Sequence, residues 1–346
     1  MLNEVVIAVA LVVLSVVGVL ILLELRRGRA TLGASATRLP TSVPVAHEGV
    51  GEDITLLARQ PRLPVIEAGS DVEESTPSSA ATLFEEGTEI DEPTGSKKMF
   101  LVWAAGQTDR GKARKRNEDS ILLLSDYALF VVADGMGGYA GGDVASKIAC
   151  EAIEKSFRSG NLAGTPERGS NRPMKGNELV WALEAANEAI RAEARKHTEY
   201  GKMGATIISA RFLEKKQRAF IGHVGDSRCY RLRRGELRLL TTDHTMAAKG
   251  VPGPVGQHVR RALGVGPKIQ VDLLVDRPHL DDIYLLCSDG LNKMVDDARI
   301  AEVLQRHMGD LDEAVRVLID EANRSGGKDN VSVILVGIRP AAKKVA

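Results

Sequence analysis

Apolar runs that alternate with polar, glycine-rich segments cover the chain from residue 99 to its end. Short runs rich in Val, Ile, Leu and Phe predict strands, and an unbroken run such as 129–133 is typical of a strand buried on both faces. The predicted strands are 100–105, 120–124, 129–133, 206–212, 217–224, 227–233, 236–241, 269–274, 283–287 and 331–338. The chain is therefore expected to be rich in strands.

Apolar residues at helical spacing predict four helices, which come in two pairs. In the first helix, Val144, Ile148 and Ala152 recur four residues apart. The predicted helices are 142–157, 178–196, 298–307 and 311–323. Because consecutive strands and clustered helices do not follow the regular alternation of a parallel α/β sheet, the pattern predicts an α+β sandwich.

The first 29 residues differ from the rest because they contain an uncharged apolar stretch at 5–23. Its length matches the ~20 residues that a helix needs to cross a bilayer, so residues 1–29 are expected to form a single-pass transmembrane anchor. Arg26, Arg27 and Arg29 follow directly, and because positive residues stay on the cytoplasmic side, everything after the anchor is expected in the cytoplasm. A cleaved secretory signal, opposed by the lack of Lys and Arg before the stretch, and a buried soluble helix are the alternatives.

Residues 30–98 are rich in Pro, Gly, Ser, Thr and Glu and show neither a strand period nor a helix period. Such a segment buries too little apolar surface to offset its ordering entropy, so it is expected to be a disordered linker. Its part at 84–92 carries acidic residues around Thr88, which fits a phosphorylation or docking site or a solvated acidic stretch. The predicted organisation is an anchor at 1–29, a flexible linker at 30–98 and one folded domain at 99–340.

Composition excludes some classes of protein. The chain of 346 residues has 46 Lys and Arg and 46 Asp and Glu, so its formal net charge is zero. Binding of nucleic acid needs a strongly basic face, so no nucleic-acid partner is expected. Cys150, Cys229 and Cys287 are far apart and odd in number, which indicates neither a disulfide framework nor a CxxC zinc site.

Acidic residues stand at the ends of several apolar runs, in four short patches. The patches are Asn117-Glu118-Asp119, Asp134-Gly135, Ser288-Asp289-Gly290 and Asp329-Asn330. Carboxylate oxygens, with a glycine carbonyl that an ion can approach closely, are the donors that hard divalent cations prefer. An ordinary Asp-Gly turn is the alternative for each patch alone, and a P-loop is opposed by the missing Lys-Ser/Thr. The patches are distant in sequence, so only a folded core that gathers strand ends can unite them.

Arg114 lies in a basic run just before the first acidic patch. A guanidinium group suits the binding of phosphate because it donates two parallel hydrogen bonds. A solvated basic surface is the alternative interpretation of this run alone.

Together these motifs resemble those of the metal-dependent protein phosphatases, the PPM or type 2C serine/threonine phosphatase family, in its bacterial form. The matching segments are Thr108-Asp109-Arg110-Gly111, 114–120, 132–138, Met203-Gly204-Ala205-Thr206, 222–228, Thr242-Asp243-His244, Arg261-Ala262-Leu263-Gly264, Ser288-Asp289-Gly290 and Gly327-Lys328-Asp329-Asn330. They occur in the family's order and span residues 100–338, which makes the resemblance specific.

The resemblance implies a central β-sandwich of two antiparallel sheets flanked by helices, with two Mn²⁺ or Mg²⁺ ions in one site. By this analogy Asp134 bridges both ions, and the Gly135 carbonyl binds the second. Asp289 and Asp329 bind the first ion. The carboxylate and carbonyl donors agree with Mg²⁺ or Mn²⁺ rather than with zinc.

The remaining roles follow from the same analogy. Glu118 and Asp119 hold water molecules around the ions, and Arg114 binds the substrate phosphate, while Asp226 matches a largely structural position. The implied reaction is hydrolysis of phosphoserine and phosphothreonine on proteins by a metal-activated water. The implied setting is the cytoplasmic side of the membrane, where the enzyme opposes a serine/threonine kinase.

Two departures from the family pattern stand out. Met136 follows the Asp-Gly where animal relatives have a His, so the general acid is unassigned. Only 16 residues separate His244 from Arg261, where bacterial relatives carry a longer flap. A catalytically silent module that binds phosphoproteins, and a two-metal hydrolase of small phosphate esters, are the alternative functions.

Overall fold

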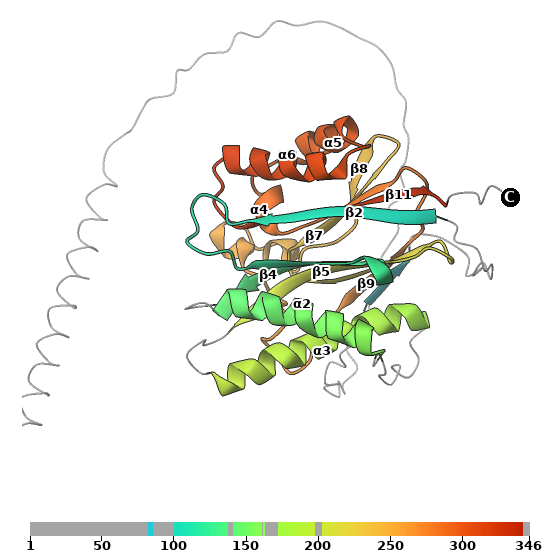
Figure 1. The fold of residues 1–346 in the computed structure, drawn as a ribbon. Helices are drawn as coiled ribbons and strands as arrows, with labels where there is room; N and C mark the ends of the chain where they lie inside the picture. The colour runs from blue at the N-terminus through green and yellow to red at the C-terminus, as the bar shows by residue number, and fades with distance from the viewer. Residues whose placement is uncertain are drawn as a thin grey trace, which may run out of the picture. The chain divides into compact units, whose positions relative to one another are not determined.

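Two β-sheets stacked face to face form the centre of the molecule, and helices cover both outer faces (Figure 1). The computed structural model describes residues 82–85, 100–137, 141–160, 162, 172–197 and 203–341. The six-stranded sheet has the order β1 (Thr82–Glu85), β9 (Asp272–Asp276), β6 (Arg218–Val224), β5 (Gly204–Leu213), β4 (Leu129–Met136) and β3 (Asp119–Leu124). The five-stranded sheet has the order β2 (Phe100–Asp109), β11 (Val331–Pro340), β10 (Ile283–Cys287), β7 (Arg228–Arg233) and β8 (Glu236–Leu239).

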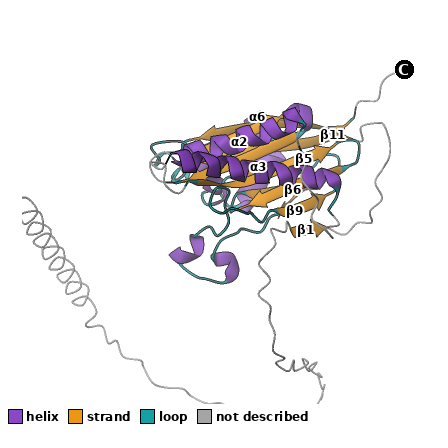
Figure 2. Cartoon of the chain, turned by 90° about the horizontal axis from the view of Figure 1, so that it is seen from below, coloured by secondary structure: helices purple, strands orange, loops and turns teal. Residues whose placement is uncertain are grey.

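Each sheet has its own pair of long helices. Helices α2 (Gly141–Ser159) and α3 (Met174–Lys196) lie across the six-stranded sheet, with β1 at its edge beside β9 (Figure 2). Helices α5 (Asp297–Arg306) and α6 (Leu311–Arg324) cover the five-stranded sheet, and the short α4 (Asp289–Asn292) follows β10. Asp296 is the N-cap residue before helix α5, and its carboxylate accepts the Arg299 amide at 2.8 Å.

Side chains that point alternately to the two faces of the central strands form three apolar layers. In β4, Leu129, Val131 and Ala133 pack against α2 and α3. Phe130 and Val132 point the other way, into the layer between the two sheets. Because successive strand residues face opposite sides, an unbroken apolar run is what a strand covered on both faces requires.

The predicted α+β sandwich of antiparallel sheets flanked by helices is confirmed. One pairing differs from an antiparallel arrangement, because β1 pairs with β9 in parallel register from Thr82 to Glu85. This strand falls inside the segment predicted to be a disordered linker, so residues 82–85 correct that prediction. The physical reason is that β9 would otherwise leave a row of unpaired backbone groups at the sheet edge.

Other boundaries also moved. The strand predicted at 269–274 begins three residues later, at Asp272. Ile269 and Val271 are buried against the helices, but they precede the residues of β9 that pair with the neighbouring strands. Helix α4 and the 3₁₀ turns Ala247–Lys249 and Pro254–Gln257 were not predicted. All three are shorter than the windows in which apolar periodicity is measurable.

The predicted transmembrane anchor at 1–29 and the linker outside 82–85 lie beyond the described residues. Within the described ranges, no helix combines the length and apolar character needed to cross a bilayer. The anchor and its cytoplasmic orientation therefore stay predictions.

A buried polar network ties the two sheets together. Asp276 of β9 accepts a hydrogen bond from Arg231 Nη1 of β7 at 2.7 Å and one from the Tyr284 hydroxyl of β10 at 2.6 Å. All three residues are buried. The carboxylate thus joins the six-stranded sheet to two strands of the five-stranded sheet.

Candidate active site

A cavity of about 240 Å³ opens where several strands of the sandwich end. Its lining residues are Arg114, Glu118, Asp134, Gly135, Met136, Gly137, Thr206, Asp226, Gln257, Val259, Asp289, Lys293, Asp329 and Asn330. Six of the seven residues that the sequence singled out are among them, and Asp119 is the exception. The fold therefore brings together acidic patches that are far apart in the chain.

Asp134 occupies the centre of this arrangement. In β4 it faces Asp119 of β3 on one side and Thr206 of β5 on the other. Burial, followed by the nearby carboxylates of Asp119 and Asp289, raises the pKa of Asp134 well above its ordinary value. A half-buried carboxylate surrounded by like charges is costly unless a cation compensates it. The position is therefore one that favours bound cations.

Gly135 is required by its close neighbours. A Cβ atom at this position would lie 2.0 Å from the carbonyl oxygen of Gly142 and 2.5 Å from that of Glu118. The Gly135 amide also donates to the Glu118 carbonyl at 3.1 Å. Only glycine lets the strand end, the start of α2 and the Glu118 loop meet at the cavity wall.

Asp289 is the first residue of α4, which Ser288 separates from the end of β10. The next residue, Gly290, packs so tightly that a Cβ would lie 1.9 Å from the Asn330 carbonyl oxygen. One turn further on, Lys293 forms an ion pair with the Asp289 carboxylate. The two acidic patches of β10 and β11 therefore meet through backbone contact, and a cationic side chain neutralises one of them.

Arg114 and Asp329 pair at the more exposed part of the cavity. The Arg114 Nη2 atom donates to Asp329 Oδ2 at 2.7 Å, and the Arg114 side chain is 49% exposed. This hydrogen bond raises the pKa of Arg114 above its ordinary value. Because half of the Arg114 side chain is exposed and it lines the cavity, it is accessible to a substrate that enters there.

Asn330 holds the loop that carries Arg114 and Glu118. Its side-chain amide donates to the carbonyls of Arg110 at 2.9 Å and Arg116 at 2.8 Å. Its Oδ1 accepts the Glu118 amide at 2.9 Å. Three hydrogen bonds from one buried side chain fix the loop against the start of β11.

Glu118 lines the cavity as predicted, and burial raises its pKa. Asp119 lies underneath, where its Oδ2 accepts from Ser288 Oγ at 2.8 Å and from Ser332 Oγ at 2.7 Å. Ser288 and Ser332 belong to the five-stranded side, so Asp119 links the two sheets below the cavity. Its predicted contact with water around an ion remains a prediction.

Two charged residues of the cavity wall were not predicted to act there. Burial and the carboxylate of Asp289 raise the pKa of Asp226 to about 6. Asp226 follows a buried strand and a glycine, whereas Asp134 and Asp289 each precede a glycine, so the Asp-Gly pattern did not single it out. Lys293 carried no such signal, because its place depends on the short helix α4.

The donor set of the cavity fits divalent cations that prefer oxygen. Asp134, Asp289, Asp329 and the Gly135 carbonyl supply only oxygen atoms, as Mg²⁺ and Mn²⁺ prefer. In the part of the chain that the structure describes, no three acidic, His or Cys side chains close on a single point. Instead, Arg114 and Lys293 lie against two of the carboxylates. Cations entering the cavity would replace those basic partners.

The raised pKa of Asp119 predicts how the metal-free protein responds to pH. Burial raises this pKa to about 7, whereas an unfolded Asp titrates at ~3.9, so the folded state holds the proton more tightly. That contribution to stability is complete below the unfolded pKa and is lost as the pH rises through about 7. We expect the midpoint temperature of thermal unfolding, measured in chelator, to decrease as the pH is raised from about 5 to about 8.

Thermal unfolding in EDTA across this range measures the effect, with Asp119→Asn as the control whose midpoint varies less. Saturating Mn²⁺ should raise the wild-type midpoint at the alkaline end, because binding to the folded state stabilises it. A wild-type midpoint that rises with pH in EDTA would contradict this account.

The layered sandwich and its carboxylate-lined cavity define a metal-dependent hydrolase. A family model described as protein phosphatase 2C matches residues 108–322. The serine/threonine phosphatase stp of Listeria welshimeri is 33% identical over 244 residues, which cover 66% of this chain and 93% of that protein. PstP of Mycobacterium tuberculosis, a serine/threonine protein phosphatase, is 34% identical over 250 residues, covering 69% of this chain and 45% of that protein.

Solved structures agree with these relatives. The catalytic domain of PstP in complex with 2 manganese ions has a TM-score of 0.58 and 34% identity, covering 69% of this chain and 99% of that one. PppA of Pseudomonas aeruginosa has a TM-score of 0.60 and 30% identity, and the match covers 70% of this chain and 100% of that one. The chain therefore belongs to the protein phosphatase 2C family. It is a metal-dependent protein serine/threonine phosphatase, as its motifs predicted.

Proposed function

We propose that this chain dephosphorylates phosphoserine and phosphothreonine proteins at the cytoplasmic face of a membrane and opposes a serine/threonine kinase there. The observation that carries the catalytic part is the meeting of Asp134, Asp289 and Asp329 with Arg114 in one cavity. The membrane part rests on the apolar stretch at 5–23 and the arginines that follow it.

The carboxylates of Asp134, Asp289 and Asp329 and the Gly135 carbonyl would hold two Mn²⁺ or Mg²⁺ ions. When bound, such a pair of ions lowers the pKa of water and stabilises charge on phosphate oxygens. Asp134 orients the pair because its backbone is fixed between β3 and β5. Asp119, held by two serines, keeps the floor of the cavity rigid.

Arg114 binds the substrate phosphate in this proposal. Its guanidinium group exchanges the Asp329 carboxylate for phosphate oxygens, which a planar fork of donors matches in geometry. The exchange becomes favourable when cations take over the negative charge of Asp329. Arg114 then stabilises the charge that develops on the equatorial oxygens.

Replacing Arg114 with Ala is expected to lower kcat/KM for a phosphothreonine peptide by roughly 10²- to 10³-fold, the loss typical for one charged contact to a transition state. Arg114→Lys should recover part of this loss, because a point charge without the fork remains. Initial rates with saturating Mn²⁺ measure the effect. Lys115→Ala is the matched control, since Lys115 is exposed and does not line the cavity. Equal rates for Arg114→Ala and the control would refute the assigned role.

The membrane and kinase proposals need separate tests. Reporter fusions at either end of the chain should place the C-terminal end in the cytoplasm, and deletion of 1–29 should release the protein from membranes. A strain that carries Asp289→Ala should accumulate phosphoserine and phosphothreonine proteins relative to its parent. A protein that stays in the soluble fraction with 1–29 intact would refute the anchor, and an unchanged phosphoproteome would refute the opposition to a kinase.

A further inference from the structure

Two basic side chains line the phosphatase cavity, those of Arg114 and Lys293. Each forms an ion pair with a carboxylate that is proposed to hold the ions. Arg114 pairs with Asp329, and its side chain is 49% exposed. Lys293 pairs with Asp289, and its side chain is 41% exposed. Lys293 is therefore placed like the residue that the proposed function assigns to the substrate phosphate, but it has no role there so far.

The backbone holds Lys293 at the cavity wall. Its amide donates to the Asp289 carbonyl at 3.0 Å, and the Val295 amide donates to the Leu291 carbonyl at 2.9 Å. Leu291 and Val295 are buried in the apolar core beside the five-stranded sheet. The Cα atom of Lys293 is thus fixed, while its flexible four-carbon side chain can move the ammonium group from one acceptor to another.

The formal charges of the cavity favour a further cation once the ions are bound. Five carboxylates line it, those of Glu118, Asp134, Asp226, Asp289 and Asp329. Two divalent ions and Arg114 would together balance these five negative charges, so the lining would carry one net positive charge with Lys293 and none without it. A phosphate monoester brings roughly 1.5 to 2 negative charges at neutral pH, which a positive lining matches better.

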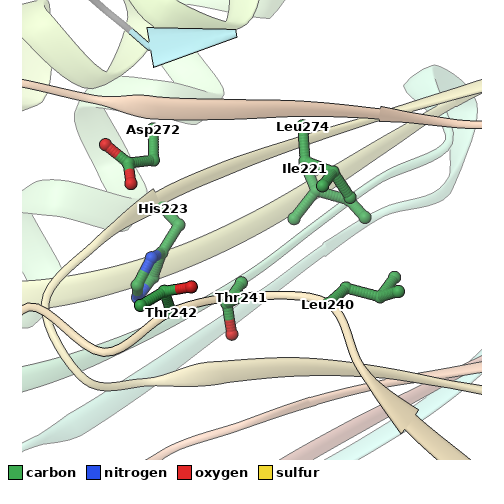
Figure 3. Close-up of a pocket in the computed structure, with 7 residues that line it drawn as sticks. All are labelled: Ile221, His223, Leu240, Thr241, Thr242, Asp272 and Leu274. Carbon is green, nitrogen blue, oxygen red and sulfur yellow. The ribbon is translucent and has the colours of Figure 1, made fainter. Parts of the chain in front are cut away.

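A second hollow, of about 110 Å³, lacks this property. It lies between β6, β9 and the segment 240–242, and it shares no lining residue with the phosphatase cavity (Figure 3). Burial lowers the pKa of its lining residue His223 to about 3, so the imidazole is neutral. Its charged lining residue is the acid Asp272, which accepts a hydrogen bond from Arg261 Nη1 at 2.9 Å. An anion therefore finds no cation on the lining of this hollow.

Two acceptors compete for the ammonium group of Lys293 when ions occupy Asp289. One is Asp226, whose carboxylate lies close enough to interact with Lys293 electrostatically. The other is the phosphate of the substrate, which enters the same cavity. Phosphate is the stronger acceptor, because it offers three oxygens and more negative charge than a single carboxylate.

We propose that Lys293 binds a phosphate oxygen of the substrate together with Arg114. This assignment rests on the proposed function, since it requires ions at Asp289. Arg114 donates two parallel hydrogen bonds from its planar fork, and Lys293 adds a point charge on a flexible stem. Lys293 thereby strengthens the binding of phosphorylated substrates and of the phosphate product.

Inorganic phosphate is the probe that tests this contact. Calorimetric titration of the full-length protein at saturating Mn²⁺ should give a dissociation constant roughly tenfold higher for Lys293→Met than for the wild type, near the lower end for a hydrogen bond to a charged group. Lys293→Gln should show the same loss, and Lys293→Arg should recover most of it because the charge remains. Lys147→Met is the matched control, since Lys147 also pairs with an Asp four residues earlier but does not line the cavity.

Binding of Mn²⁺ is measured separately, from the electron paramagnetic resonance signal of free Mn²⁺, so that a loss of ions is not mistaken for a loss of phosphate contact. Lys293→Met should bind Mn²⁺ at least as tightly as the wild type, because a competing cation has been removed. A phosphate dissociation constant equal to the wild-type value at saturating Mn²⁺ would overturn the proposal. Lys293 would then be only a counter-charge of the metal-free cavity.

Turnover of a phosphothreonine peptide separates this inference from the proposed function. In Lys293→Met, KM should rise roughly tenfold while kcat changes by less than about threefold, as expected when a contact present in both the bound substrate and the transition state is lost. A wild-type protein that does not hydrolyse the peptide would refute the proposed function itself. Normal hydrolysis by the wild type, with an unchanged KM in Lys293→Met, would refute only the role given to Lys293.

Discussion

Replacing Asp134 with Asn should lower kcat/KM for a phosphoserine peptide by at least about 10³-fold, because in the proposed function this carboxylate holds both ions, and losing it would remove several kcal/mol of transition-state stabilisation. The substitution keeps the shape of the side chain and removes its charge. The Asp134 carboxylate is half-buried among other carboxylates, and its loss of solvent together with these charges raises its pKa well above the ordinary value. The same substitution should therefore make the metal-free protein more stable at neutral pH while it abolishes activity.

This combination separates loss of chemistry from loss of folding. Initial rates with Mn²⁺ and thermal unfolding in EDTA are measured on the same samples of full-length protein. Asp312→Asn is the matched control, since Asp312 is exposed on α6 and does not line the cavity. An Asp134→Asn protein that retains a tenth or more of wild-type activity would contradict the central place given to this residue.

Replacing Asp276 with Ala should lower the free energy of unfolding by about 3–5 kcal/mol, the range found when one partner of a buried ion pair is removed. The Arg231 guanidinium group and the Tyr284 hydroxyl would both lose an acceptor between the two sheets. Tyr284→Phe should cost only about 1–3 kcal/mol, because it removes one donor and leaves the ion pair. Urea unfolding at neutral pH measures both.

The double variant Arg231→Met with Asp276→Leu serves as the control. It removes both charges at once, so we expect a loss well below that of Asp276→Ala alone. A loss under about 1 kcal/mol for Asp276→Ala would show that the network contributes little to holding the sheets together.

Much of the sandwich could be predicted from the sequence, because a strand that is buried on both faces is apolar along its whole length. The runs at 129–133 and 283–287 are apolar throughout, and both became central strands. Asp134 follows the first run directly and Asp289 follows the second after Ser288, so their position at strand ends could be inferred from spacing alone. Their meeting in one cavity depended on the family resemblance, since periodicity does not show which strand ends are neighbours.

Features that depend on distant parts of the chain were missed. Strand β1 gains its pairing from β9, nearly two hundred residues later, and its composition resembles that of the linker around it. The sequence also contained no sign that Ser288 and Ser332 of the opposite sheet donate hydrogen bonds to Asp119 below the cavity. Such contacts depend on how the two sheets stack, and a local sequence pattern does not predict that stacking.

The most direct test of the account is the location of bound manganese in crystals of this protein soaked with Mn²⁺. Anomalous scattering should show two ions about 3.5–4 Å apart in the cavity, both at coordination distance from Asp134. Lys293 and Arg114 should have moved off Asp289 and Asp329. Ions bound elsewhere, or a cavity in which Asp134 contacts no manganese, would contradict the account.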